Sequence, residues 1–184
     1  MRNRMTGATL DMNEGHETSR LVDRLPDDIE DAVRDLLEVA CDRSLTLATA
    51  ESCTGGLIGA LLTDVEGCSH AFERGFIVYS AEAKAGMLGI ARSLIDEEGV
   101  VSEAVALAMV KGALAHSRAD VALAVTGFAG AAAPGDEAGL VHLASLRRGR
   151  TPVHRVLHLG DRGRAAVRLE AVRTAVAMMR AALD

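Results

Sequence analysis

Residues 45–62, which read LTLATAESCTGGLIGALL, decide the fold. Residues 45–50 form a short apolar run that is typical of a buried strand, and residues 57–62 have the apolar spacing of a helix. The segment between them, ESCTGG at residues 51–56, predicts a tight turn because adjacent glycines favour irregular backbone. A strand, a tight turn and a helix in this order indicate an α/β fold.

The rest of the chain also alternates between helices and strands. A helix is expected to begin after Pro26, where acidic residues follow and apolar residues recur at helical spacing. Further helices are expected at residues 81–88, 93–98, 102–117 and 164–183, and further strands at residues 76–79, 121–125, 140–146 and 153–159. This alternation predicts one three-layer α/β/α sandwich over residues 25–184. Residues 1–24 are polar and lack a sustained period, so we expect a flexible tail there.

The composition fits one globular domain of 184 residues. Aromatic residues make up only 2% of the chain, so the core must consist of aliphatic side chains. Because few aromatic rings are available to stack on bases and the formal net charge is −6, we do not expect nucleic-acid binding. Three cysteines without a Cys-x-x-Cys pair are not typical of a disulfide framework or a structural zinc site.

Two further observations indicate a cytoplasmic protein. No uncharged run is long enough to span a membrane, and the N-terminus lacks the apolar segment of a signal peptide. The cysteine pattern also fits a reducing compartment. We therefore expect no membrane association, and the Ala-, Val- and Met-rich helices favour a homo-oligomer.

The charge is distributed unevenly along the chain. Residues 25–100 carry 5 basic and 15 acidic residues, whereas residues 147–184 carry 9 basic and 3 acidic ones. The basic segment is either a solvated helix face or a source of arginines for a local anion site.

The turn at residues 51–56 is the first candidate for chemistry. Ser52 lies where a nucleophile could face an oxyanion site that is made by the backbone N–H groups of the turn. The simpler interpretation is that Ser52 or Thr54 caps the following helix. Cys53 is an alternative nucleophile, although a small buried side chain is the simpler role for it.

The second candidate segment is FIVYSAEAK at residues 76–84. It places Tyr79 at the end of a strand and Lys84 near the start of a helix. A lysine can act as the base of a serine nucleophile if burial lowers the pKa of its ammonium group. Taken alone, Lys84 would more often be a surface charge and Tyr79 an ordinary aromatic residue at a strand end.

The third candidate segment, TGFAG at residues 126–130, offers small residues that let a ligand approach the backbone closely. Ligands of α/β sheets bind at the carboxyl ends of strands, so we expect all three segments at one edge of the sheet. The chain contains no G-x-G-x-x-G or Walker sequence, so neither a dinucleotide fold nor an ATPase is indicated. His154 and His158 fall in an expected strand, where their spacing does not form a helical metal pair, and we expect no metal site.

These segments, in this order, resemble the C-terminal domain of the competence-damage-inducible protein family. The matching stretches are TLATAESCTGGLIGALLTDVEGCS, FERGFIVYSAEAKAGMLGI, GVVSEAVALAMVKGAL and ADVALAVTGFAG, with Gly163-Arg164 and Val167-Arg168 after them. Stand-alone members of this family are nicotinamide-nucleotide amidohydrolases. The resemblance implies hydrolysis of the carboxamide of nicotinamide mononucleotide to nicotinate mononucleotide and ammonia, without a metal or an organic cofactor. It also implies a mixed, mostly parallel five-stranded sheet.

The resemblance assigns roles to particular residues. Ser52 matches the nucleophile, Lys84 its base and Tyr79 an aromatic hydroxyl beside them. Residues matched to substrate binding are Glu51, Thr54, Gly55 and Gly56 in the turn, Thr126 and Gly127 in the third segment, and Arg164 near the phosphate. Arg162 competes with Arg164 for the phosphate, because the segment 160–164 is longer here than the family's G-D-R.

The loop at residues 130–139 departs from the family pattern. The family has T-G-I-A-G-P followed by glycines, whereas here Gly130 is followed by AAAPG. Fewer glycines make the loop stiffer, so a catalytically inactive nucleotide-binding or regulatory module of the same fold is the alternative function. A purely structural oligomerisation domain is a third possibility. Phe128, where the family more often has an aliphatic residue, is predicted to flank the nicotinamide ring.

Overall fold

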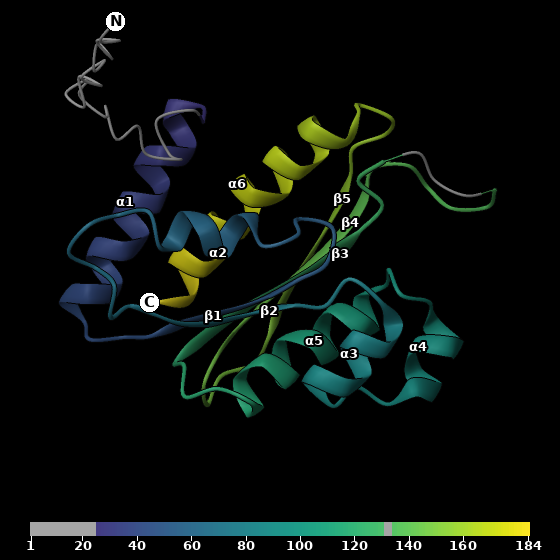
Figure 1. Cartoon of the computed structure of the whole chain (residues 1–184), viewed down its shortest axis with the longest axis horizontal. Helices are drawn as coiled ribbons and strands as arrows, with labels where there is room; N and C mark the ends of the chain where they lie inside the picture. Colours follow the sequence, from purple (N-terminus) through teal and green to yellow (C-terminus); the bar gives the residue numbers. More distant parts are fainter. Residues whose placement is uncertain (1–24, 131–133) are drawn as a thin grey trace, which may run out of the picture.

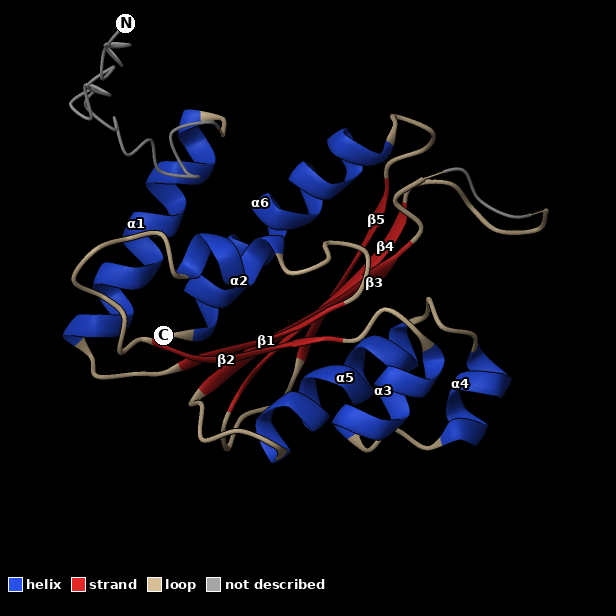
Figure 2. Cartoon of the chain, in the orientation of Figure 1, coloured by secondary structure: helices blue, strands red, loops and turns tan. Residues whose placement is uncertain are grey.

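The computed structural model describes residues 25–130 and 134–184, which form three layers (Figures 1 and 2). A twisted sheet lies between two groups of helices. Helices α1, α2 and α6 pack on one face of the sheet, and helices α3, α4 and α5 pack on the other. The predicted α/β/α sandwich is therefore confirmed.

The elements follow the predicted alternation. In chain order they are α1 (Asp27–Asp42), β1 (Leu47–Glu51), α2 (Leu57–Leu62), β2 (Phe72–Ile77), α3 (Ala81–Leu88), α4 (Arg92–Glu98), α5 (Glu103–Ala115), β3 (Val121–Gly127), β4 (Leu140–Arg147), β5 (Val153–His158) and α6 (Arg164–Ala182). None of the helices in the described part of the chain is long and apolar enough to cross a membrane.

The sheet has the strand order β2-β1-β3-β4-β5. Strand β1 is parallel to both β2 and β3, whereas β4 is antiparallel to β3 and to β5. Among these five strands only β4 therefore runs in the opposite direction, which confirms a mixed and mostly parallel sheet. The register pairs Glu51 with Val125, so the carboxyl ends of β1 and β3 lie side by side.

The central strands carry the core, because every residue of β1 is buried and β3 is buried from Val121 to Thr126. Leu47 and Leu123 pack with the first group of helices, while Ala48 and Ala124 pack with the second. Alternation of this kind is what a strand that is covered on both faces requires. The aliphatic core that the composition predicts is therefore observed.

The second strand differs from its prediction. It was expected at residues 76–79, but β2 covers Phe72–Ile77, and Tyr79 follows the strand. Strand β2 is an edge strand that pairs only with β1, so Phe76 alone of its residues is buried and the others are partly buried or exposed. The charged pair Glu73-Arg74 and Gly75 thus interrupt the apolar pattern by which the strand would have been recognised.

Strands β3 and β4 form a hairpin whose base is closed by backbone hydrogen bonds. The N–H of Phe128 donates to the carbonyl of Leu140 at 2.9 Å, and the N–H of Gly139 donates to the carbonyl of Phe128 at 2.9 Å. Thr126 and Gly127, which were expected in the loop, are the last residues of β3. The predicted tail at residues 1–24 and the alanines 131–133 lie outside the described residues.

Candidate active site

The predicted tight turn directly follows β1. The N–H of Ser52 donates to the carbonyl of Val125 at 3.0 Å, which fixes the start of the turn against β3. Gly55 and Gly56 have φ values of 62° and 92°, a left-handed conformation that glycine adopts without strain. A Cβ atom on Gly56 would also lie 2.9 Å from Cδ1 of Ile77. The left-handed conformation therefore favours glycine at both positions, and the close approach of Ile77 adds a reason at Gly56.

Glu51 holds the turn from the side of α2. Its side chain is 1% exposed, and one carboxylate oxygen accepts hydrogen bonds from Oγ1 of Thr54 at 2.7 Å and from the N–H of Gly56 at 3.0 Å. The N–H groups of Ile58 and Gly59 also donate to the carboxylate, at 3.1 and 2.8 Å. The carboxylate thus caps the N-terminus of α2, a role that the sequence did not reveal.

Ser52 and Lys84 meet on the other side of the turn. Nζ of Lys84 lies 3.1 Å from Oγ of Ser52 and donates to the carbonyl of Val78, also at 3.1 Å. The two side chains are 6% and 1% exposed, so Lys84 is not the surface charge that its local sequence favours. Helix α3 presents it here, and Ser80 caps that helix by accepting from the N–H of Ala83 at 3.1 Å.

The environment of Lys84 suits a base. Burial lowers the pKa of its ammonium group, because the charged form loses hydration. Among the described residues no carboxylate acts on this pKa, and only the nearby Cys53 opposes the shift. A lowered pKa makes the neutral amine more accessible, and a neutral lysine can take the proton of a serine hydroxyl.

Cys53 is a poor rival nucleophile. Its side chain is buried, and burial raises the pKa of its thiol to about 11, although Lys84 and Arg168 act in the opposite direction. At neutral pH the group is therefore a thiol rather than the reactive thiolate. The structure thus supports the simpler interpretation of Cys53 as a small buried side chain.

A cavity of about 260 Å³ opens beside the Ser52–Lys84 pair, at the carboxyl ends of β1 and β3. The predicted site residues that line it are Ser52, Tyr79, Lys84, Thr126, Gly127 and Arg164, and Phe128 lines it as well. Tyr79 is 68% exposed, so its ring lies at the rim. The three candidate segments therefore meet at one edge of the sheet, as the topology rule predicts.

Other predicted site residues lie beside the cavity rather than in its wall. Glu51, Thr54, Gly55 and Gly56 are not among the described residues that line it, and they instead shape the turn from behind. Arg162 is likewise not part of the described wall, whereas Arg164 is. A Cβ atom on Gly130 would lie 2.8 Å from Nη2 of Arg164, so the guanidinium group packs directly against this glycine.

Three participants were not singled out from the sequence. Val100 and Val101 precede α5 and line the cavity, and the carbonyl of Val100 accepts from Oγ1 of Thr126 at 2.8 Å. Arg168, in α6, donates from Nη2 to the carbonyl of Thr54 and so ties the turn to the last helix. Arg168 belongs to the Val167-Arg168 stretch that matches the family, but the sequence did not assign it a role.

The basic segment serves two purposes. Arg173 pairs with Asp28 at 2.5 Å and Arg180 pairs with Asp35 at 2.7 Å, so two arginines of α6 neutralise acidic residues of α1. Arg164 instead faces the cavity. Arg173 and Arg180 therefore belong to a partly exposed helix face with ion pairs, while an anion site at Arg164 stays a prediction.

The histidines pair with nearby side chains. His142 and His154 stack with ring centroids 5.2 Å apart, and Nδ1 of His142 lies 3.1 Å from Nε2 of His154. His158 pairs with Glu137 at 2.8 Å instead. Within residues 25–130 and 134–184, no three His, Cys, Asp or Glu side chains are arranged to hold a metal ion.

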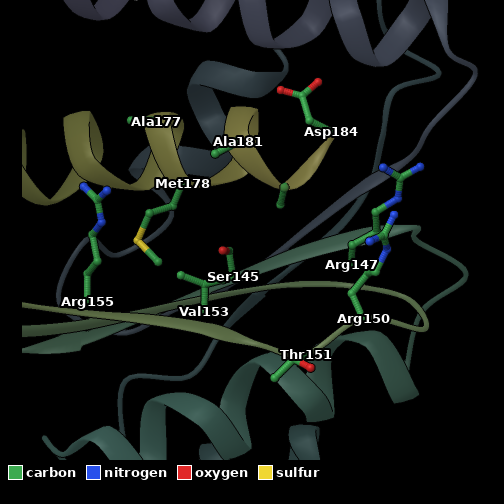
Figure 3. A pocket seen from close by; sticks show the side chains of 11 residues that line it. Ser145, Arg147, Arg150, Thr151, Val153, Arg155, Ala177, Met178, Ala181 and Asp184 are labelled. Carbon is green, nitrogen blue, oxygen red and sulfur yellow. The ribbon is translucent and has the colours of Figure 1, made fainter.

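Figure 3 shows a second, larger cavity of about 410 Å³ at the opposite end of the sheet. It lies between β4, β5 and the last turns of α6, with Arg147, Arg150 and Arg155 around it. Its hydroxyl groups belong to Ser145 and Thr151, and among the described residues that line it none is a lysine or histidine. Size alone would not select the cavity beside Ser52, but the presence of a nucleophile and a base does.

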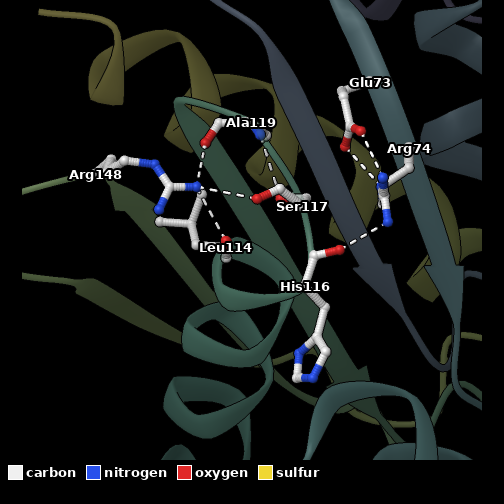
Figure 4. Close-up of polar contacts among 7 residues, drawn as sticks. All are labelled: Glu73, Arg74, Leu114, His116, Ser117, Ala119 and Arg148. Carbon is white, nitrogen blue, oxygen red and sulfur yellow. Dashed lines mark hydrogen bonds and ion pairs between the residues drawn. The ribbon is translucent and has the colours of Figure 1, made fainter.

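Arginines at the same end of the sheet hold the C-terminus of α5 (Figure 4). Nη2 of Arg148 donates to the carbonyls of Leu114 at 3.0 Å and Ala119 at 2.9 Å, and Nη1 of Arg74 donates to the carbonyl of His116 at 2.7 Å. The last carbonyls of a helix lack intrahelical partners, so these contacts satisfy groups that would otherwise be unpaired. These two arginines are structural.

Comparisons with known proteins agree with this geometry. A family profile described as the CinA C-terminal domain matches residues 28–183. The nicotinamide-nucleotide amidohydrolase PncC of Escherichia coli K12 is 43% identical over 132 residues, which cover 70% of this chain and 79% of that protein. The crystal structure of a competence/damage-inducible protein from Agrobacterium tumefaciens is 42% identical, with a TM-score of 0.84, over 87% of this chain and 98% of that one.

Several curated relatives are much longer than this chain. A putative competence-damage inducible protein of Symbiobacterium thermophilum is 50% identical over 111 residues, which cover 59% of this chain but 26% of that protein. A relative of the same description in Caldicellulosiruptor bescii is 40% identical over 150 residues, which cover 78% of this chain and 36% of that protein. The chain thus spans about a quarter to a third of the length of these relatives.

Proposed function

Because the chain belongs to the CinA C-terminal domain family, we propose that it is an amidohydrolase that removes the amide of nicotinamide mononucleotide. The products are nicotinate mononucleotide and ammonia. The observation that carries the proposal is the 3.1 Å contact between Oγ of Ser52 and a buried Lys84 at the wall of a cavity. The amidohydrolase name of a relative that is 43% identical supports the choice of substrate.

The first step is attack by Ser52. Neutral Lys84 takes the hydroxyl proton while Oγ forms a bond to the carboxamide carbon, and the carbonyl oxygen becomes an oxyanion. The lowered pKa of Lys84 supplies the neutral amine that this step requires. The hydrogen bond from Nζ to the carbonyl of Val78 holds the amine in place.

The turn offers two backbone donors for the oxyanion. The N–H groups of Ser52, Gly55 and Gly56 are already bonded, to the carbonyls of Val125 and Ser52 and to the carboxylate of Glu51. Among the described residues, no carbonyl accepts from the N–H of Cys53 or Thr54. These two donors directly follow the nucleophile and are therefore the groups that we assign to the oxyanion, each worth roughly 3–4 kcal/mol in the transition state.

The second half of the reaction reverses the proton transfer. Protonated Lys84 gives its proton to the leaving nitrogen, the C–N bond breaks and ammonia departs. Water then attacks the acyl ester of Ser52, with Lys84 again as the base, and releases the acid. Tyr79 at the rim is a second hydroxyl through which a proton can pass, and the chain's own groups carry every step.

The other end of the cavity suits the nucleotide. Arg164 lies at the start of α6, where a guanidinium group can bind a phosphate by two parallel hydrogen bonds. Phe128 lines the same cavity and is the aromatic surface that we assign to the nicotinamide ring. Thr126 and Gly127 form the wall beside the ring, while the turn residues Glu51 to Gly56 act by holding Ser52.

The test is an assay of ammonia release from nicotinamide mononucleotide, with free nicotinamide and the dinucleotide as comparators. Activity of the wild-type chain and its loss in Ser52→Ala are expected, while Ser69→Ala, on the surface loop before β2, serves as the matched control. Near wild-type activity of Ser52→Ala would contradict the assignment. Thermal stabilisation by the mononucleotide without turnover would instead support the alternative, an inactive binding or regulatory module.

Self-association and a cytoplasmic location stay predictions from the sequence. Size-exclusion chromatography with light scattering tests the first of them, because a homo-oligomer elutes with a multiple of the 19.3 kDa chain mass.

A further inference from the structure

Two cysteines that are distant in the sequence meet at the end of α1. Cys41 lies in the last turn of this helix, and Cys68 lies in the connection between α2 and β2. Sγ of Cys68 is 3.9 Å from the carbonyl oxygen of Leu37, one helical turn before Cys41. Because a helical carbonyl points along the axis toward the residue four positions later, this places the Cys68 sulfur beside Cys41.

The surroundings of the pair allow it to react. Both thiols are half-buried and pack against the same apolar cluster below α1, so each keeps some access to solvent. Cys68 is also near enough to contribute to the raised pKa of the Cys41 thiol. Cys53, in contrast, is buried in the turn after β1.

We propose that Cys41 and Cys68 form a reversible intramolecular disulfide when the protein meets a peroxide. The proximity of the two cysteines could not be predicted from the sequence, because they are far apart in it and form no Cys-x-x-Cys pattern. The proposal does not depend on the amidohydrolase activity, since neither residue lies in the described wall of the active-site cavity.

The chemistry balances with hydrogen peroxide as the oxidant. The thiolate of Cys68 attacks one peroxide oxygen, so an S–O bond forms, the O–O bond breaks and hydroxide leaves. The thiol sulfur of Cys41 then attacks the Cys68 sulfur, so the S–S bond forms and the S–O bond breaks, and the departing oxygen takes the Cys41 proton as water. The hydroxide recovers the proton that Cys68 released earlier. Two thiols lose two electrons in total and peroxide gains them, giving two waters.

The order of the two sulfurs follows from their environment. Burial and the neighbouring Cys68 raise the pKa of the Cys41 thiol to about 11, so Cys41 remains protonated near neutral pH. A thiol that stays protonated is a poor first attacker, so we assign the reaction with peroxide to Cys68, and Cys41 then resolves the sulfenic acid as its proton passes to the departing oxygen.

The cross-link closes a loop that carries the active site. The segment between the two cysteines contains β1, the Ser52 turn and α2. A bond between side chains that already touch in the folded state restricts mainly the unfolded chain. We therefore expect oxidation to raise the Tm by roughly 5–10 °C, and dithiothreitol to reverse the rise.

The experiment uses the full chain, reduced, then treated with a small excess of hydrogen peroxide and blocked with N-ethylmaleimide. Before blocking, the intact mass of the oxidised chain is expected to be lower than that of the reduced chain by two hydrogen atoms. After blocking, one cysteine is expected to carry the reagent, and peptide mapping is expected to show Cys41 joined to Cys68. Cys41→Ser and Cys68→Ser should each abolish the link and the rise in Tm. Cys53→Ala is the matched control that should keep both.

Three results would overturn the proposal. One is a link that includes Cys53 or joins two chains. Another is accumulation of a sulfinic acid at Cys68 without any link. The third is a Cys41–Cys68 link that forms equally in the unfolded chain and leaves the Tm unchanged, which would remove the stabilising role.

Discussion

The two sides of the Ser52 turn each bury one ionisable side chain, but the two groups are treated differently. Glu51, on the side of α2, accepts four hydrogen bonds and fixes the backbone of the turn. Lys84, on the side of the cavity, has one hydroxyl and one carbonyl for its three possible donors, and no carboxylate acts on its pKa among the described residues. A buried ionisable group whose hydrogen bonds are all satisfied stabilises the local backbone. A buried ammonium group with too few partners has a lowered pKa and loses its proton more readily.

Removing Lys84 should produce the largest effect. In Lys84→Met the nucleophile loses its base, so we expect kcat/KM for the mononucleotide to fall by about 10³-fold or more, with KM little changed. Lys111→Met, at the other lysine of the chain and on the surface of α5, is the matched control. Comparable activity of the two variants in the ammonia assay would remove Lys84 from the mechanism.

The activity and the stability of the wild-type chain should both depend on pH through the protonation of Lys84. Activity needs neutral Lys84, so it should rise with pH and reach half its maximum below the ordinary lysine pKa of 10.5. The unfolded state, where the pKa is ordinary, binds more protons between the two pKa values, so the free energy of unfolding should rise with pH in that window. Denaturant melts of Lys84→Met should lack this increment, and a profile with no such rise would contradict the assignment.

Glu51→Ala tests the other side of the turn. Four donors at the start of α2 would lose a charged acceptor in a buried place, so we expect a loss of about 3 kcal/mol in the free energy of unfolding. Urea titration measures the loss, and Glu97→Ala, exposed on α4, controls for the change in charge. If Glu51→Ala had the same free energy of unfolding as its control but lost all activity, Glu51 would act in the reaction rather than in holding the turn.

Arg164→Gln should have a smaller effect, confined to binding. Loss of a charged contact to phosphate should raise KM for the mononucleotide by about 10-fold to 100-fold and leave the phosphate-free riboside unaffected. Arg162→Gln is the matched control and should behave like the wild type. The opposite result would transfer the phosphate contact to Arg162.

The smallest effect is expected from Phe128→Ile. An aliphatic side chain keeps the apolar wall but loses the aromatic face, so KM for the mononucleotide should rise about threefold, within the 0.5–1.5 kcal/mol of an aromatic pair. Steady-state kinetics at saturating and limiting substrate measure it. An unchanged KM would exclude a role for the ring in binding nicotinamide.

The features that the sequence predicts correctly are local. Glycines and apolar spacing place the turn at residues 51–56 and the helices at 57–62 and 81–88 where the structure has them. The contact between Ser52 and Lys84 is different, because no local pattern says which face of α3 turns toward β1. That pair was reached through the family resemblance.

Other features escaped prediction for physical reasons. Strand β2 lies at an edge of the sheet, so its charged residues are tolerated and its pattern is weak. The capping role of Glu51 depends on three backbone N–H groups and the Thr54 hydroxyl, whose positions exist only in the folded turn. The contact of Cys68 with the Leu37 carbonyl, which brings Cys68 to the end of α1 near Cys41, joins two elements that no sequence period relates.

Because β4 is antiparallel to β3, the segment beside the cavity that follows β3 is a hairpin, and this hairpin does not contain Ser52 or Lys84. The β3–β4 connection is a hairpin whose base is closed by backbone hydrogen bonds of Phe128, Gly139 and Leu140. Ser52, in contrast, follows β1, and Lys84 lies in α3. Insertions or replacements beyond that base can therefore remodel what enters the cavity without shifting the dyad.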